Sequence, residues 1–148
     1  MHWLLYISIL IGVLASVEDL CRRRISNQTS VAAFALGLTA QTVLHGLKGT
    51  GNALAGTFIG FLVFLIFFLL GGMGAGDIKL MAGFGAVLGV GQTLQAAFLT
   101  AIVGAAFALL YLLVRKIRGQ SKTDAVNPEA IPYAPAITLG VLLSFAAR

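Results

Sequence analysis

Charged residues are scarce in this sequence: only 10% of its 148 residues are charged, whereas 59% are hydrophobic. The mean hydropathy of +0.97 is far above that of a soluble domain of this size. Uncharged runs that are long enough to cross a bilayer recur along the chain. This composition excludes a soluble globular protein and predicts an all-α, polytopic membrane helix bundle.

Long polar segments are missing too, because no stretch of more than about fifteen residues is polar enough to form a soluble module or a linker. We therefore expect residues 1–148 to form one transmembrane domain. The net charge of +5 does not indicate a nucleic-acid partner, because the basic residues stand in short clusters beside apolar runs, where they act as topology signals.

Cysteine occurs once, at Cys21. A single cysteine excludes an internal disulfide and a zinc site built from several cysteines. Its place beside the basic cluster Arg22–Arg24 suits a reducing cytoplasm.

The N-terminal apolar run, Met1–Val17, does not have the order of a cleaved signal peptide, because its basic cluster follows the run instead of preceding it. We predict a retained first helix that starts outside the cell and ends on the cytoplasmic side at Glu18–Asp19. A cytoplasmic loop over Glu18–Thr29 follows.

The remaining apolar sequence divides at glycine-rich and polar segments into five further helices. They are predicted over Ser30–Leu47, Asn52–Leu70, Ile78–Leu88, Thr93–Val114 and Ile131–Ala147, with a glycine-rich turn over His45–Gly51 and a polar segment over Arg115–Ala130. About six membrane spans result.

The basic residues support this topology independently of any motif. Cytoplasmic ends of membrane helices carry an excess of Lys and Arg. Of the ten Lys and Arg residues, two fall outside (Lys48 and Arg148) and eight inside: Arg22, Arg23, Arg24, Lys79, Arg115, Lys116, Arg118 and Lys122.

A glycine-rich stretch, Gly71–Lys79, directly follows the most apolar run of the chain and contains Asp77. A carboxylate near hydrocarbon usually faces a protein interior or a watery cavity, and it is a functional-site candidate. The alternative is that the glycines form a flexible turn and that Asp77 is an ordinary N-cap of the next helix.

All five acidic residues fall on the predicted inner side: Glu18, Asp19, Asp77, Asp124 and Glu129. Asp19 and Asp77 are the nearest to hydrocarbon, and the out-and-back helix pair between them returns the chain to the same membrane surface. Two adjacent carboxylates that share one proton can activate water and polarise a peptide carbonyl, as in aspartyl proteases. This chemistry needs no metal ion and no cofactor.

The helix dipoles suggest how the two acids divide their roles. Asp77 starts a helix, where the dipole favours an anion, whereas Asp19 ends one, where the dipole disfavours it. Asp77 is then the ionised base and Asp19 carries the proton, in a pair that titrates together.

Three sequence blocks resemble the motifs of one known family. Gly74-Ala75-Gly76-Asp77 resembles the G-x-G-D signature of membrane aspartyl proteases, and Lys79 extends it in the manner of the type IV prepilin peptidases. The block from Asp19 to Asn27 resembles the first motif of that family, an Asp followed by basic residues and Ile-Pro-Asn. The block from Pro132 to Pro135 resembles its Pro-aromatic-Gly-Pro segment.

Two positions depart from the family pattern. Ser26 stands where the family usually has Pro, and Ala134 stands where it usually has Gly. Long family members also carry an N-terminal cytoplasmic domain with cysteine pairs and methylate the new pilin N-terminus. This sequence is similar instead to the short peptidases of tight-adherence (Flp-type) pilus systems, so cleavage without methylation is expected.

The resemblance implies Asp19 and Asp77 as the catalytic pair, supported by Gly74, Gly76 and Lys79. Lys79 either stabilises a carboxylate or anchors at lipid headgroups. The implied substrate is a prepilin with a basic leader ahead of an apolar helix, cut at the cytoplasmic face of the bacterial inner membrane. The substrate-binding residues and the oligomeric state stay open.

Two other classes of function remain open at this point. Paired intramembrane acids also serve as proton or cation relays, so a small transporter or channel subunit is the main alternative. A non-catalytic scaffold of a pilus or secretion complex is the other.

Overall fold

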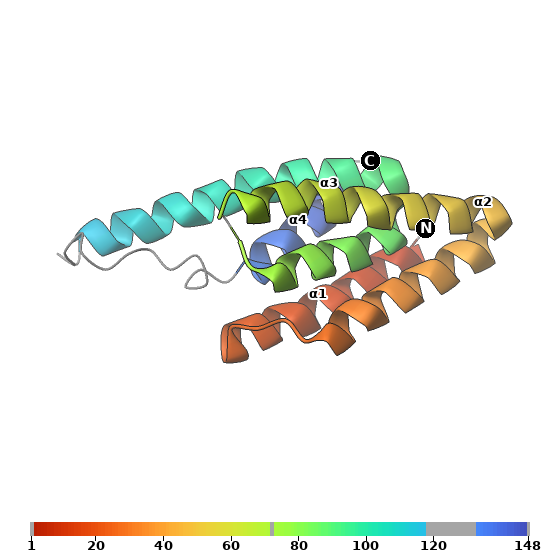
Figure 1. Cartoon of the computed structure of the whole chain (residues 1–148), viewed down its shortest axis with the longest axis horizontal. Coiled ribbons are helices and arrows are strands. Elements are labelled where there is room, and N and C mark those ends of the chain that lie inside the picture. Colours follow the sequence, from red (N-terminus) through yellow and green to blue (C-terminus); the bar gives the residue numbers. More distant parts are fainter. Residues whose placement is uncertain (1, 72, 118–132, 148) are drawn as a thin grey trace.

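The computed structural model describes residues 2–71, 73–117 and 133–147. Four helices make up most of this part of the chain: α1 (His2–Arg22), α2 (Asn27–Leu69), α3 (Ala75–Ile117) and α4 (Ala134–Ala146). They pack side by side as an elongated bundle (Figure 1). The all-α prediction is therefore confirmed over the described residues.

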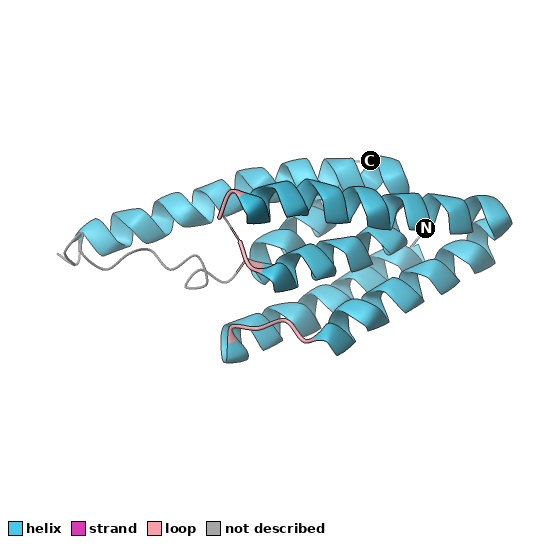
Figure 2. Ribbon diagram, in the orientation of Figure 1, coloured by secondary structure: helices cyan, strands magenta, loops and turns pink. Residues whose placement is uncertain are grey.

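The two long helices are each interrupted once by a glycine in the left-handed region. Gly46 has φ 61° in α2 and Gly89 has φ 72° in α3, a conformation that other residues rarely adopt. At each interruption the helix doubles back, so that α2 and α3 are hairpins of two helical halves (Figure 1). The α1–α2 and α2–α3 connections lie at the opposite end of the bundle (Figure 2).

Together with α1 and α4, the four halves make six helical segments in the described part of the chain. Three helices have stretches long and apolar enough to cross a membrane, namely Trp3–Arg22, Asn27–Leu69 and Ala75–Tyr111, and α4 is a shorter apolar helix. The helices thus support a membrane protein, and the six-span arrangement stays a prediction.

Two of the predicted connections are wrong in extent. The predicted loop over Glu18–Thr29 shrinks to the residues between Arg22 and Asn27, because α1 continues past Asp19 and α2 starts earlier. The predicted turn over His45–Gly51 shrinks to Gly46 alone. The larger part of the polar segment, with Asp124 and Glu129, lies outside the described residues.

The break at Gly89 exposes backbone groups that side chains of α2 satisfy. The amide oxygen of Asn52 accepts the N–H of Val90 at 3.1 Å, and the amide nitrogen of Gln41, itself buried, donates to the carbonyl of Val87 at 2.8 Å. A backbone N–H or C=O group that lacks a hydrogen-bond partner inside a membrane costs roughly several kcal/mol. Polar residues of α2 therefore make this sharp turn possible.

Glycines let α2 and α3 approach each other closely. A Cβ atom on Gly56 would overlap the backbone of Gly85, and a Cβ on Gly85 would overlap the backbone of Gly56. Small residues at such crossings provide the close contact that holds membrane helices together. The close packing of α3 against α2 therefore fixes the position of the start of α3.

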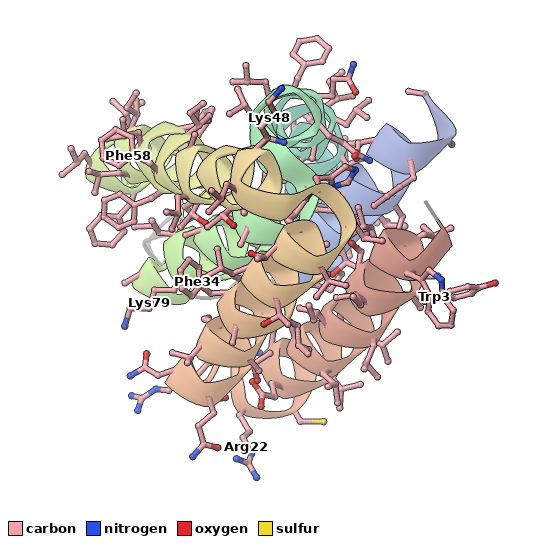
Figure 3. The ribbon with its side chains drawn as sticks, turned by 90° about the vertical axis from the view of Figure 1, so that its right-hand side faces the viewer. Trp3, Arg22, Phe34, Lys48, Phe58 and Lys79 are labelled. Atoms are coloured by element: carbon pink, nitrogen blue, oxygen red, sulfur yellow. The ribbon has the colours of Figure 1, made fainter. Side chains whose placement is uncertain are left out.

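The outer surface of the bundle is apolar. Trp3 is 72% exposed and Phe58 is 63% exposed, and both side chains point away from the helices (Figure 3). Phe64 of the same helix as Phe58 is buried in the core. An apolar exterior of this kind suits contact with lipid.

Candidate active site

Asp77 lies in the first turn of α3, and its carboxylate folds back on the start of the helix. Its Oδ2 accepts the backbone N–H of Gly74 at 3.0 Å, while its own N–H donates to the Gly74 carbonyl at 3.1 Å. This is the arrangement of the third residue in a capping box. Asp77 is therefore not itself the N-cap, although its carboxylate does stabilise the helix start. The side chain is only 6% exposed.

Asp19 lies in the last turn of α1 and is 8% exposed. Its Oδ2 accepts the backbone N–H of Ala134, the first residue of α4, at 3.0 Å. The free N–H groups at the start of a helix need such partners. A contact across 115 positions of sequence thus joins the end of α1 to the start of α4.

Both carboxylates accept a hydrogen bond at the N-terminus of a helix, Asp77 at that of α3 and Asp19 at that of α4. The positive end of a helix dipole favours an anion at each place. In this respect the surroundings of the two carboxylates are equivalent. The division of roles was inferred from the end of α1 and the start of α3, without the start of α4 beside Asp19, and which acid carries the proton stays a prediction.

The three motif blocks meet at the end of the bundle that holds the connections. Gly76 packs against Ile25, so closely that a Cβ on Gly76 would lie 3.2 Å from the Ile25 Cβ. The N–H of Ala134 binds Asp19, which joins the third block to the first. Residues far apart in sequence are thus gathered around two buried carboxylates.

Glu18 holds the corner between α1 and α2. Its carboxylate accepts the N–H of Ser26 at 3.0 Å, the hydroxyl of Ser26 at 3.2 Å and the hydroxyl of Thr29 at 2.8 Å. Ser26 is also the N-cap of α2, since its hydroxyl accepts the N–H of Thr29. The corner next to Asp19 is therefore tied by four hydrogen bonds.

The two departures from the family motifs have simple structural accounts. Ser26 has φ −69°, the value at which proline is fixed, so the backbone keeps a proline-like path while its N–H binds Glu18. Ala134 is helical and fully buried, and it still donates its N–H to Asp19. Neither substitution removes a contact of the carboxylates.

Lys79 points away from the bundle (Figure 3). Its ammonium group donates to the side-chain oxygen of Asn27 at 2.9 Å. Its polar contact within the described residues is therefore with an amide oxygen and not with a carboxylate. Lys79 thus links the start of α3 to the start of α2.

Replacing Lys79 with methionine should lower the stability of the protein only modestly, because a hydrogen bond of this kind contributes about 0.5–1.5 kcal/mol to the free energy of unfolding. The variant Asn27→Ala should lose a similar amount, and the double variant should lose little more than either single one, since both remove the same bond. Thermal unfolding in detergent measures all three. A double variant whose loss equals the sum would show that the two residues act independently.

Sequence reasoning named Gly74 and Ala134 as motif positions but missed their role as hydrogen-bond donors to the carboxylates. The donors are backbone N–H groups of Gly74 and Ala134, and a backbone donor has no signature in its side chain. Glu18 was noted for its charge alone, and its contacts with Ser26 and Thr29 depend on the tight corner. One signal was present in the sequence, because proline is favoured in the first turn of a helix and Pro135 is the second residue of α4. It could have indicated a helix start, with free N–H groups, near Ala134.

Comparison with known proteins shows the family of the chain. The chain is similar to the prepilin leader peptidase/N-methyltransferase of Bacillus subtilis (strain 168), with 31% identity over 142 residues. The similarity covers 95% of this chain and 53% of that relative, so the chain spans about half the length of the curated relative. No solved structure matches it significantly. The sequence model of the type IV leader peptidase family matches residues 4–109, and the chain therefore belongs to that family.

Proposed function

We propose that the protein is a membrane aspartyl endopeptidase that removes the basic leader of a type IV prepilin. The observation that carries the proposal is the pair of buried carboxylates, each held by a backbone N–H at a helix start. The name of the Bacillus subtilis relative gives the substrate class. The narrower assignment to Flp-type prepilins rests on the sequence resemblance.

The chemistry follows from a carboxylate pair that shares one proton. The ionised carboxylate takes a proton from water as the water oxygen attacks the scissile carbonyl carbon, while the protonated one donates its proton to the carbonyl oxygen. Collapse of the tetrahedral intermediate breaks the C–N bond; the leaving nitrogen receives a proton from one carboxyl group of the pair, while a hydroxyl of the intermediate returns its proton to the other carboxylate. Like charges at short range make the shared proton favourable, and no covalent intermediate forms.

We also propose that the six helical segments all cross the membrane, with the N-terminus outside and the carboxylates at the cytoplasmic face. The same excess of basic residues that orients the peptidase would keep a basic leader on that side. Enzyme and cleavage site would then lie on one membrane surface.

The native Cys21 tests the orientation without any substitution, because it is exposed and follows Asp19 by two residues. A membrane-impermeant maleimide should label it in inside-out vesicles and not in intact cells. As a control, Lys48→Cys in a Cys21→Ser background should be labelled from the opposite side. Labelling of Cys21 in intact cells would contradict the proposed orientation.

Proteoliposomes that contain the purified protein test the activity itself. A prepilin with a basic leader and an apolar helix should be cut once, between these two parts, as mass spectrometry of both products would show. If the protein is an ion relay, the prepilin stays intact and a proton or cation flux appears instead. If it is a scaffold, neither cleavage nor flux appears.

A further inference from the structure

A cavity of about 190 Å³ opens between the second halves of α2 and α3. Phe64 and Phe67 of α2 form one wall, and small residues of α3, among them Ala101, Gly104 and Ala105, form the other. None of the described residues that line it is charged. The cavity is thus mainly apolar and lies at the side of the bundle.

One end of this cavity lies at the candidate active site. Met73 and Tyr133 line it there. Met73 directly precedes Gly74, whose N–H binds Asp77, and Tyr133 directly precedes Ala134, whose N–H binds Asp19. The cavity is therefore one residue away from each backbone group that holds a carboxylate.

Resting on the proposed function, we infer that this cavity receives large apolar side chains from one face of the substrate's apolar helix, next to the bond that is cut. A helix is roughly 10 Å across, so a cavity of this volume takes side chains and not a whole helix. The alanines and the glycine of α3 let a second helix come close. The uncharged lining suits the apolar segment of the substrate and not its basic leader.

The lining beside the active-site end of the cavity is small. Thr100 also lines the cavity, but its hydroxyl oxygen is buried beside Gly140 of α4 and adds no polar group to the cavity. Gly104 faces Tyr133, so that a Cβ there would lie 3.7 Å from the ring. The small residues of α3 therefore keep space open beside the aromatic ring at the active-site end.

Two neighbouring alanines of α3 provide a matched test. Ala105 lines the cavity and Ala106 does not, and both are exposed at the outer surface, so a larger side chain at either position avoids the core. The variant Ala105→Trp should lower kcat/KM for prepilin cleavage about tenfold or more, mainly by raising KM, since even one methylene more or less in an apolar pocket changes kcat/KM about 10–200-fold. The variant Ala106→Trp should stay close to the wild type.

Crosslinking provides a second readout that does not need activity. Benzoylphenylalanine in the apolar helix of the prepilin should crosslink to the residues that line the cavity of the inactive Asp77→Asn protein. Adding Ala105→Trp to that protein should reduce the crosslink, and adding Ala106→Trp should not. Equal cleavage by both tryptophan variants, or a crosslink to lipid alone, would overturn the inference while wild-type cleavage upheld the proposed function. A wild-type protein that cuts no prepilin would overturn both.

Discussion

Replacing either Asp19 or Asp77 with asparagine should abolish leader cleavage while the helix bundle stays folded. An asparagine oxygen can still accept the N–H of Ala134 or Gly74, so the hydrogen bonds that join the helix starts to the carboxylates are kept. An amide can neither take a proton from water nor pass one on at neutral pH. Loss of positioned acid–base catalysis costs about 10²–10⁴-fold or more in rate.

The neighbouring acid provides the control for this prediction. Glu18→Gln removes one negative charge next to Asp19. Glu18 binds Ser26 and Thr29 at the start of α2, whereas the two aspartates bind the starts of α3 and α4. We expect Glu18→Gln to retain most of the activity, because a glutamine oxygen can still accept from Ser26 and Thr29. Quantitative cleavage assays in proteoliposomes compare the three variants. Equal losses in all three would mean that general charge on this face, and not a catalytic pair, drives cleavage.

Replacing Gly85 with alanine should cause a large loss of stability of the helix bundle. The added methyl group would overlap the backbone of Gly56, and backbone cannot move aside as a flexible side chain can. Overpacking of this kind costs about 1–3 kcal/mol. Because α3 carries Asp77 at its start, a shift of α3 against α2 should reduce cleavage as well.

Gly91→Ala is the matched control, two residues beyond the break at Gly89. Nothing lies within 4 Å of a Cβ atom at Gly91, and the position is helical, so alanine should be neutral or stabilising there. Thermal unfolding in detergent compares the two variants. If Gly85→Ala unfolded at the wild-type temperature, the close crossing of α2 and α3 would be wrong.

Much of the helix pattern could be predicted from the sequence, because apolar runs of membrane length are a strong signal. The breaks near His45 and Gly89 were also predicted, since glycine clusters interrupted those runs. The extents of the turns were not. Each turn is tightened by a contact from elsewhere, such as Asn52 with Val90 or Glu18 with Ser26. Hydropathy does not reveal contacts of that kind.

The candidate site shows the same division. Asp19 and Asp77 were predicted as a pair from topology and from the resemblance of their motifs. That Asp19 lies within α1 and accepts a hydrogen bond from α4 could not be predicted, because the donor is a backbone N–H 115 residues away. The roles assigned from the end of α1 and the start of α3 did not take the start of α4 at Asp19 into account, and they stay a prediction.

The most direct test of the account is whether positions 19 and 77 face each other in the membrane. The double variant Asp19→Cys/Asp77→Cys in a Cys21→Ser background holds two thiols, and a short bifunctional thiol reagent should join them within one molecule. Mass spectrometry of the intact protein distinguishes one bridge from two separate additions. The pair Asp19→Cys/Lys48→Cys, at opposite ends of the bundle, should give two additions. Two separate additions at positions 19 and 77 would contradict a shared catalytic pocket.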